Sequence, residues 1–171
     1  MNADELRQLQ APLKGQYKTD PSAALITLKA AGELDADNVV CRVETGRALV
    51  EAGLHPATGG SGAFACSGNM LLDALVACAG VTLKAVATAI GFQLAGGKVF
   101  AEGDLDFRGT LGVDKEAPVG FREIRLHFQL DSTEPQERVD QLVKLTERYC
   151  VVFQTLARPA RLSLRVDRAV P

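Results

Sequence analysis

The stretch SGNMLLDALVACAGVTLKAVATAIG, residues 67–91, decides the fold of this chain. Leu, Ala and Met fill most of its positions, and these residues rank high in helix propensity. Ser67 or Asn69 is expected to cap the first turn, and Gly91 to supply a left-handed C-cap. The interior of the stretch holds four polar side chains, Asp73, Thr82, Lys84 and Thr88. Since apolar groups cover the rest of the circumference, we expect a helix over residues 69–90 that is buried on most sides.

Alternating apolar and polar residues elsewhere in the chain predict antiparallel sheets. The expected strands are residues 23–30, 38–50, 99–108, 123–130 and 161–167, with a turn at 35–38. Strict alternation is typical of sheets with one packed and one wetter face. Further helices are expected at residues 3–17 and 134–149, the second capped by Ser132 or Thr133. This order of elements predicts an α+β fold, with an N-terminal helical extension at residues 1–20 and a single domain at 21–171.

Composition limits the classes of function. The 171 residues carry a formal net charge of -2, so the basic footprint of a nucleic-acid-binding protein is missing. Asp73 and Lys84 would be costly inside a membrane span, and the N-terminus shows no signal-peptide pattern. We therefore expect a soluble protein, with no membrane partner, whose four cysteines are reduced in the cytoplasm.

Two cysteines on two helices are the candidate functional residues. Cys78 lies in the middle of the apolar helix, and Cys150 closes the amphipathic helix that follows Glu134. Free cysteines are often inert core residues, so packing competes with a redox role. Only a thiolate reacts well, and the positive end of its own helix is too far from Cys78 to stabilise one. A cation would therefore have to come from another element or a partner subunit. Cys150, at a helix break, is expected to be the less buried of the two.

The remaining candidates are weaker. Cys66 could serve as an alternative resolving thiol but is favoured as a loop or core residue, and Cys41 as a core residue of a strand. His55 could line a site, although an exposed loop position is the preferred interpretation, and His127 is expected on the wet face of a strand. No two Cys or His residues share ligand-pair spacing, so no metal site is predicted.

Two motifs in this order resemble a known family. Residues 70–78, MLLDALVAC, followed by VTL at 81–83, resemble the central-helix signature of the OsmC/Ohr family. Residues 147–156, ERYCVVFQTL, resemble its second motif, in which a cysteine ends one helix and opens another. The resemblance extends over roughly residues 23–166.

The resemblance implies a fold and a function. It implies an OsmC-like fold: an intertwined homodimer in which antiparallel sheets wrap around a long buried central helix, with active sites at the subunit interface. It implies a thiol peroxidase that reduces organic hydroperoxides without a cofactor. Cys78 would attack the peroxide, Cys150 would form the resolving disulfide, and a lipoylated protein or small thiol would be the reductant.

The chain also departs from that family's pattern. Gly68 occupies the position of a glutamate ten residues before the first cysteine, and Val151 replaces the usual proline after the second. The family's activating arginine has only nearby candidates, namely Lys29, Arg42 and Arg47. Gly68 motivates an alternative hypothesis, a noncatalytic OsmC-fold dimer that binds a small apolar ligand, and a structural dimer without a ligand is a third.

Overall fold

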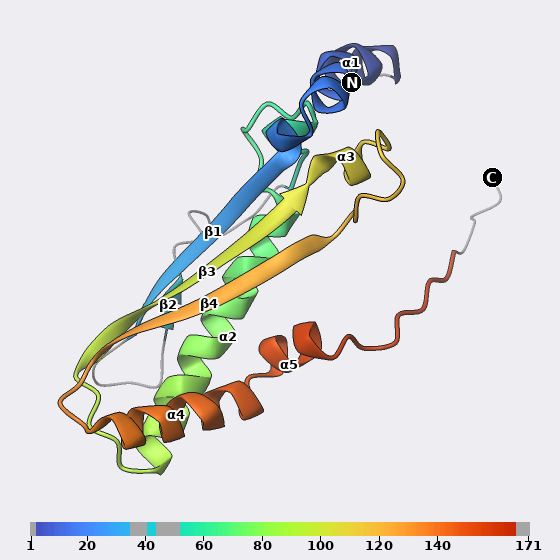
Figure 1. Cartoon of the computed structure of the whole chain (residues 1–171). Coiled ribbons are helices and arrows are strands. Elements are labelled where there is room, and N and C mark those ends of the chain that lie inside the picture. Colours follow the sequence, from blue (N-terminus) through green and yellow to red (C-terminus); the bar gives the residue numbers. More distant parts are fainter. Residues whose placement is uncertain (1–2, 35–40, 44–51, 167–171) are drawn as a thin grey trace.

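A four-stranded antiparallel sheet forms the body of the protein (Figure 1). The computed structural model describes residues 3–34, 41–43 and 52–166. The strand order is β2-β1-β3-β4, and the strands are β1 (Leu25–Leu34), β2 (Cys41–Val43), β3 (Gly96–Asp106) and β4 (Phe121–Asp131). In the register of the sheet, Ala101 on β3 lies between Ala30 on β1 and Leu126 on β4. The antiparallel pairing predicted from the alternating patterns is confirmed.

One long helix packs against this sheet. The helices are α1 (Ala3–Thr19), α2 (Ser67–Ala89), α3 (Phe107–Thr110), α4 (Gln136–Tyr149) and α5 (Val151–Ala157), with 3-10 turns η1 (Pro21–Ala24) and η2 (Pro56–Thr58). Figure 1 shows α2 running along one face of the sheet, with α4 crossing its C-terminal end and α5 beside its middle. At the opposite end, α1 gathers with η1, η2 and α3.

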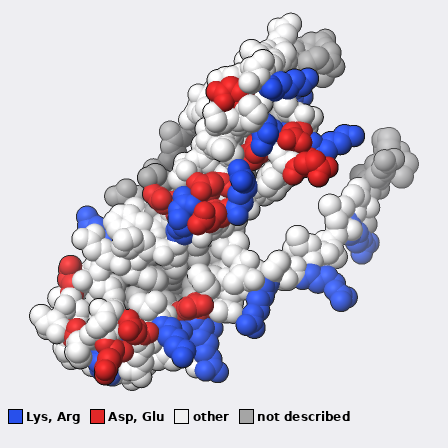
Figure 2. Space-filling view, viewed as in Figure 1, with Lys and Arg blue, Asp and Glu red and all other residues white. Residues whose placement is uncertain are grey.

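The core lies between α2 and the inward side of the sheet. Its largest apolar side chains with almost no exposure are Leu72, Leu75, Val76, Leu83, Val99 and Leu142. Burying such side chains stabilises the fold by ~1.5–3 kcal/mol each. Figure 2 shows acidic and basic side chains gathered on the opposite, outer face of the sheet. The sheet therefore has the one packed and one wet face that its sequence pattern predicts.

Within the single chain, α2 is buried on one side rather than on most sides. Met70, Leu71 and Val81 are 39%, 38% and 40% exposed. The helix is long and apolar enough to cross a membrane by length and composition, but half of its most apolar window is buried against the protein, as in a core helix. The described residues form one sheet, so the expected wrapping of α2 by sheets is not seen in one chain.

The ends of the helices differ in detail from the sequence expectation. Cys66, and neither Ser67 nor Asn69, is the N-cap of α2, and its side chain makes no capping hydrogen bond. At the other end Gly91 adopts a left-handed φ of 62°, as predicted. The N-cap of α4 is Pro135 rather than Ser132 or Thr133. Ser132 donates instead to the carbonyl of Gln93 (2.6 Å), which ties the start of α4 to the loop after α2.

The strand predicted at residues 161–167 is wrong for the single chain. Residues 161–166 form no strand, and Leu162, Leu164 and Val166 are 92%, 89% and 70% exposed. Figure 1 shows this segment leaving the body after α5. An alternating sequence becomes a strand only where a neighbouring strand accepts its backbone hydrogen bonds, and no strand of the described residues lies beside this segment. The predicted turn at 35–38, and the predicted strand 38–50 apart from 41–43, lie outside the described residues.

Candidate active site

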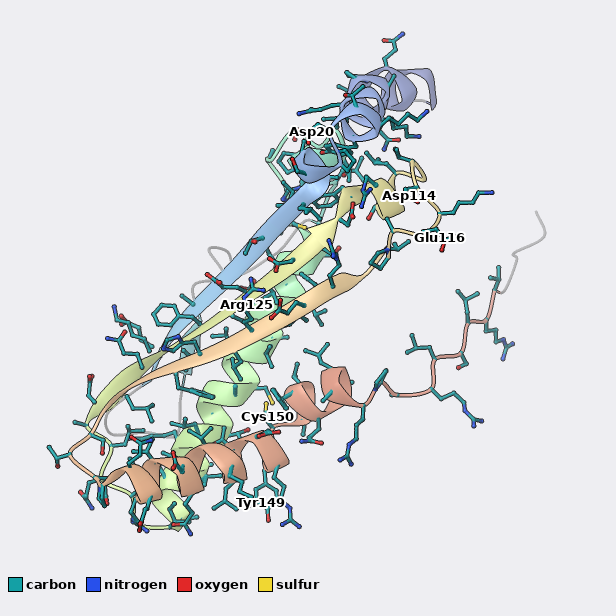
Figure 3. The ribbon with its side chains drawn as sticks, in the orientation of Figure 1. Asp20, Asp114, Glu116, Arg125, Tyr149 and Cys150 are labelled. Atoms are coloured by element: carbon teal, nitrogen blue, oxygen red, sulfur yellow. The ribbon has the colours of Figure 1, made fainter. Side chains whose placement is uncertain are left out.

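Cys78 and Cys150 meet where α2 passes the junction of α4 and α5. Cys78 lies midway along α2 and is half-buried. Cys150 is at once the C-cap of α4 and the N-cap of α5, because its ψ of 109° breaks the helical path. Figure 3 shows Cys150 at this junction, facing α2. The structure thus brings together the two cysteines singled out from the sequence.

Hydrogen bonds stabilise the thiolate form of Cys78. Burial alone would raise the pKa of this thiol and is the largest single influence. It is outweighed by backbone N–H donors of Val152 and Val151, by the S–H of Cys150 and by the hydroxyl of Thr82, so the pKa is lowered below its ordinary value. None of these donors is an arginine or a lysine. The cation expected from another element or a partner subunit is therefore not among the groups that lower this pKa, and the backbone amides at the start of α5 contribute instead.

Cys150 has the opposite electrostatics. It is 1% exposed, so the expectation that it is the less buried cysteine is wrong. Burial is the main reason that the pKa of Cys150 is raised, and the neighbouring Cys78 raises it further. A helix break need not open a side chain to solvent, and here Leu142 and Thr146 on α4 are buried alongside it. Cys150 therefore stays protonated and donates its S–H to Cys78.

This asymmetry makes the two sulfurs chemically different. The pKa of the half-buried Cys78 is lowered, so Cys78 ionises more readily than Cys150 and is the better nucleophile of the two. The protonated Cys150, hydrogen-bonded to it, lies where it could attack an oxidised Cys78 sulfur. The arrangement can therefore support a dithiol–disulfide cycle.

Val151, which stands where the resemblance predicts a proline, contributes to the electrostatics of Cys78. Its backbone N–H is one of the donors to Cys78, and a proline at this position would have no N–H to donate. Sequence reasoning missed the backbone amides of Val151 and Val152 as functional groups. The available signal was the helix break at Cys150, since a break exposes the free N–H groups of the next helix.

In the described part of the chain, the positions that correspond to the family's glutamate and arginine are not seen in contact with Cys78 or Cys150. Gly68 lies in the first turn of α2, about 15 Å along the helix from Cys78 at 1.5 Å per residue. Lys29 and Arg42 lie in β1 and β2, but their side chains, like all of Arg47, are outside the described residues.

The remaining sequence candidates are dispersed. Cys66, at the N-cap of α2, lies about 18 Å along the helix from Cys78, so within one chain it is out of reach as the resolving thiol. Cys41 lies in β2, and its side chain is outside the described residues. His127 is exposed on β4, as predicted. His55 is half-buried rather than exposed, and its ring stacks on Phe107 with 5.0 Å between centroids. The described residues contain no group of three or more Cys, His, Asp or Glu side chains placed to bind a metal.

Comparisons with known proteins agree with the fold and the two motifs. A model of the OsmC-like protein family matches residues 60–165, a range that contains Cys66, Cys78 and Cys150. Among solved structures, the chain is similar to an OsmC-like hydroperoxide resistance protein from Jannaschia sp. CCS1. The TM-score is 0.61 at 15% sequence identity, covering 85% of this chain and 95% of the other. A comparison with curated proteins gave no match. Because the family match spans more than half of the sequence, this chain belongs to the OsmC-like protein family.

Proposed function

We propose that this protein is a thiol-dependent peroxidase that reduces organic hydroperoxides through Cys78 and Cys150. The observation that carries the proposal is the pairing of a thiol of lowered pKa with a buried, protonated thiol that donates to it. The name of the structurally similar hydroperoxide resistance protein supports the same class of substrate.

The proposed cycle balances without a cofactor. The Cys78 thiolate attacks the terminal peroxide oxygen, the O–O bond breaks, and the alkoxide leaves as an alcohol after taking a proton from water. Cys78 is then a sulfenic acid, which Cys150 attacks to form a disulfide and release water. A dithiol or two small thiols reduce this disulfide and become a disulfide themselves.

A cavity lined mainly by apolar side chains supports an organic substrate, although Arg122 and Glu123 also line it and neither cysteine does. A cavity of ≈ 730 Å³ lies between α2, β4 and α5. Leu75, one turn before Cys78, and Phe153, one turn after Cys150, both line it. Such walls favour the hydrocarbon part of an alkyl or aryl hydroperoxide over hydrogen peroxide, which has none.

We further propose that the working form is a homodimer in the cytoplasm. Two observations support association. One side of α2 exposes apolar side chains, and the side chains of Leu162, Leu164 and Val166 are largely exposed to solvent. A second copy could cover both, giving α2 the wrapping that a single chain lacks. We expect neither nucleic acid nor membrane as a partner.

Turnover of cumene hydroperoxide with dithiothreitol as the reductant tests the function. We expect the wild-type protein to consume peroxide catalytically and Cys78→Ser to lose this activity. Cys66→Ser is the matched control, because it removes another cysteine associated with the same helix, and it should keep most of the activity. A wild-type rate equal to that of Cys78→Ser would overturn the proposal.

Gly68 favours one alternative, a noncatalytic dimer that binds a small apolar molecule in the same cavity. This alternative predicts that an apolar ligand stabilises the protein against heat equally in the wild type and in Cys78→Ser, while no peroxide is consumed. Catalytic turnover in the wild type would exclude it.

A further inference from the structure

A second cavity lies at the opposite end of α2 from α4. Its volume is ≈ 380 Å³, and it is bounded by the loop around η2, the start of α2, the end of β3 with α3, and the start of β4. Cys66 and Gly68 line it, whereas Cys78 and Cys150 do not. Residues 53–58, which supply one wall, precede the range matched by the family model. This cavity is therefore distinct from the contact between Cys78 and Cys150, although it adjoins the proposed substrate cavity, with which it shares Leu71, Gly120 and Phe121.

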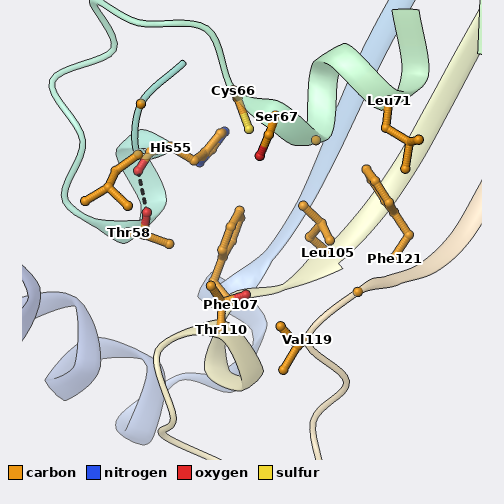
Figure 4. Close-up of a pocket in the computed structure, with 14 residues that line it drawn as sticks. His55, Thr58, Cys66, Ser67, Leu71, Leu105, Phe107, Thr110, Val119 and Phe121 are labelled. Atoms are coloured by element: carbon orange, nitrogen blue, oxygen red, sulfur yellow. Dashed lines mark hydrogen bonds between the residues drawn. The ribbon is translucent and has the colours of Figure 1, made fainter. Parts of the chain in front are cut away.

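The cavity has an apolar body and one polar end. Its apolar walls are Leu54, Leu71, Leu105, Phe107, Val119 and Phe121. At one end His55, Cys66 and Ser67 converge on the same space, as Figure 4 shows, and the hydroxyl residues Thr58 and Thr110 also line the cavity. No Asp, Glu, Lys or Arg lines the cavity. A molecule that fits here is mostly hydrocarbon and carries a single polar group.

The state of His55 indicates what that polar group must be. Burial lowers the pKa of His55, so the ring is neutral at pH 7. Its Nδ1 accepts a hydrogen bond from the backbone N–H of Ala57 (3.0 Å), so the ring proton is on Nε2. Within the described part of the chain, no partner for this Nε2–H is found. His55 is therefore a hydrogen-bond donor, and the bound group must be an acceptor.

Other contacts hold His55 in place before any ligand arrives. The hydroxyl of buried Tyr17 on α1 donates to the carbonyl of Ala57 (2.7 Å), and Thr58 donates to the carbonyl of His55 (2.9 Å). The imidazole ring lies nearly parallel to Phe107, with 16° between the planes. A donor fixed in this way loses little freedom on binding, which favours affinity.

We propose that this cavity binds a small aromatic molecule carrying one hydrogen-bond acceptor, a carboxylate or a carbonyl. The aromatic ring would pack among Phe107, Phe121 and the leucines, and the acceptor would receive the Nε2–H of His55. An apolar cavity of about 150 Å³ is enough to hold benzene, so this cavity has room for a ring and a short substituent.

Titration followed by NMR tests the proposal on the full chain. The probes are phenylacetate, phenylacetamide and toluene, which share a ring and differ in the acceptor. The protein has two histidines, so the imidazole signals of His55 and His127 report the site and an exposed control in one spectrum. We expect phenylacetate, phenylacetamide or both to shift His55 and leave His127 unchanged, with dissociation constants on the order of 1 mM for ligands of this size.

The three probes separate the outcomes. Binding of phenylacetate alone assigns a carboxylate, binding of phenylacetamide alone assigns a carbonyl, and binding of both assigns the acceptor they share. Binding of toluene as tight as either would overturn the role of the acceptor. An unchanged His55 signal with all three probes, or equal shifts of His55 and His127, would overturn the site.

Cys66 provides a second readout that does not depend on the histidine signal. At a ligand concentration ten times the dissociation constant, alkylation of Cys66 by iodoacetamide should slow by about tenfold, since about nine-tenths of the cavities are filled. His55→Ala should raise the dissociation constant by about tenfold, the effect of one hydrogen bond, so that the same ligand concentration slows alkylation only about twofold, and His127→Ala should keep the full protection. Equal protection in both variants would contradict the assignment of His55.

Discussion

The S–H of Cys150 donates a hydrogen bond to the sulfur of Cys78, across the contact between α2 and the start of α5. The same contact lowers the pKa of one thiol and raises that of the other. It makes Cys78 the more acidic and Cys150 the less acidic of two chemically identical side chains. The difference arises from position, because hydrogen bonds outweigh burial at Cys78, whereas burial outweighs the amides of Phe153 and Val152 at Cys150.

Removing one amide should weaken Cys78 as a nucleophile. Val151→Pro deletes the backbone N–H that donates to Cys78, and proline is well tolerated at the first position of a helix. A hydrogen bond to a charged group contributes ~1.5 kcal/mol, so alkylation of Cys78 near pH 7 should slow by about tenfold. The measurement is peptide-resolved iodoacetamide labelling. Val151→Ala keeps the N–H and should label like the wild type, and an equal rate for the proline variant would contradict the role of this amide.

Cys150→Ser should stop the cycle after its first step. The serine hydroxyl can still donate to Cys78, but it cannot form a disulfide. We expect one equivalent of cumene hydroperoxide to be consumed and a sulfenic acid to persist at Cys78, detected as a dimedone adduct by mass spectrometry. A Cys78–Cys66 disulfide in this variant would contradict the separation of those two residues along α2.

An ion pair on the outer face of the sheet should make stability depend on acid pH. Hydrogen bonds from Arg125, the main cause, and from Thr27 lower the pKa of Asp104 to about 2. The folded protein therefore favours the carboxylate, and the stabilisation is present above the unfolded pKa of about 3.9 and is lost as pH falls toward 2. Asp104→Asn should lower the urea midpoint at pH 7, and the difference should vanish near pH 2.

Glu33→Gln is the matched control for this prediction. Glu33 pairs with Lys98 at 3.5 Å, and both side chains are more than half exposed. Exposed ion pairs contribute little, so the urea midpoint should hardly change. A difference for Asp104→Asn that is the same at pH 7 and pH 2 would show that its charge is not the cause.

The exposed C-terminal segment should contribute to the proposed dimer. Leu164→Asp places a charge among the apolar side chains that we expect a second copy to cover, so sedimentation velocity should show a shift from dimer to monomer. Ser163→Asp adds the same charge on the other side of the extended segment and should remain dimeric. A monomeric wild-type protein at micromolar concentration would contradict the dimer itself.

Most of the fold follows from periodicity, and the exceptions share one cause. The helix over residues 67–89 and the paired strands β1, β3 and β4 are dictated by local pattern, and the structure contains them. The pattern at residues 161–167 is equally clear, yet it forms no strand, because pairing requires a neighbouring edge that local sequence cannot specify. The same limit applies to α2. Apolar side chains cover most of its circumference, but one chain buries only one side of it. The division into residues 1–20 and 21–171 stays a prediction.

The candidate site was predictable in its side chains but not in its backbone. The two motifs identified Cys78 and Cys150 from their contexts. The donors to Cys78 include the amides of Val151 and Val152, which carry no signature in residue type because every residue except proline has an N–H. Only the path of the chain at the α4–α5 junction shows that these amides point at a sulfur.

Peptide mapping under non-reducing conditions tests the central claim most directly. The reduced wild-type protein is treated with one equivalent of cumene hydroperoxide, alkylated and digested. Our account predicts a single new disulfide, joining the peptides that contain Cys78 and Cys150, with Cys66 still alkylated as a free thiol. Free thiols at both Cys78 and Cys150 after the peroxide treatment, or a disulfide that pairs either with another cysteine, would contradict it.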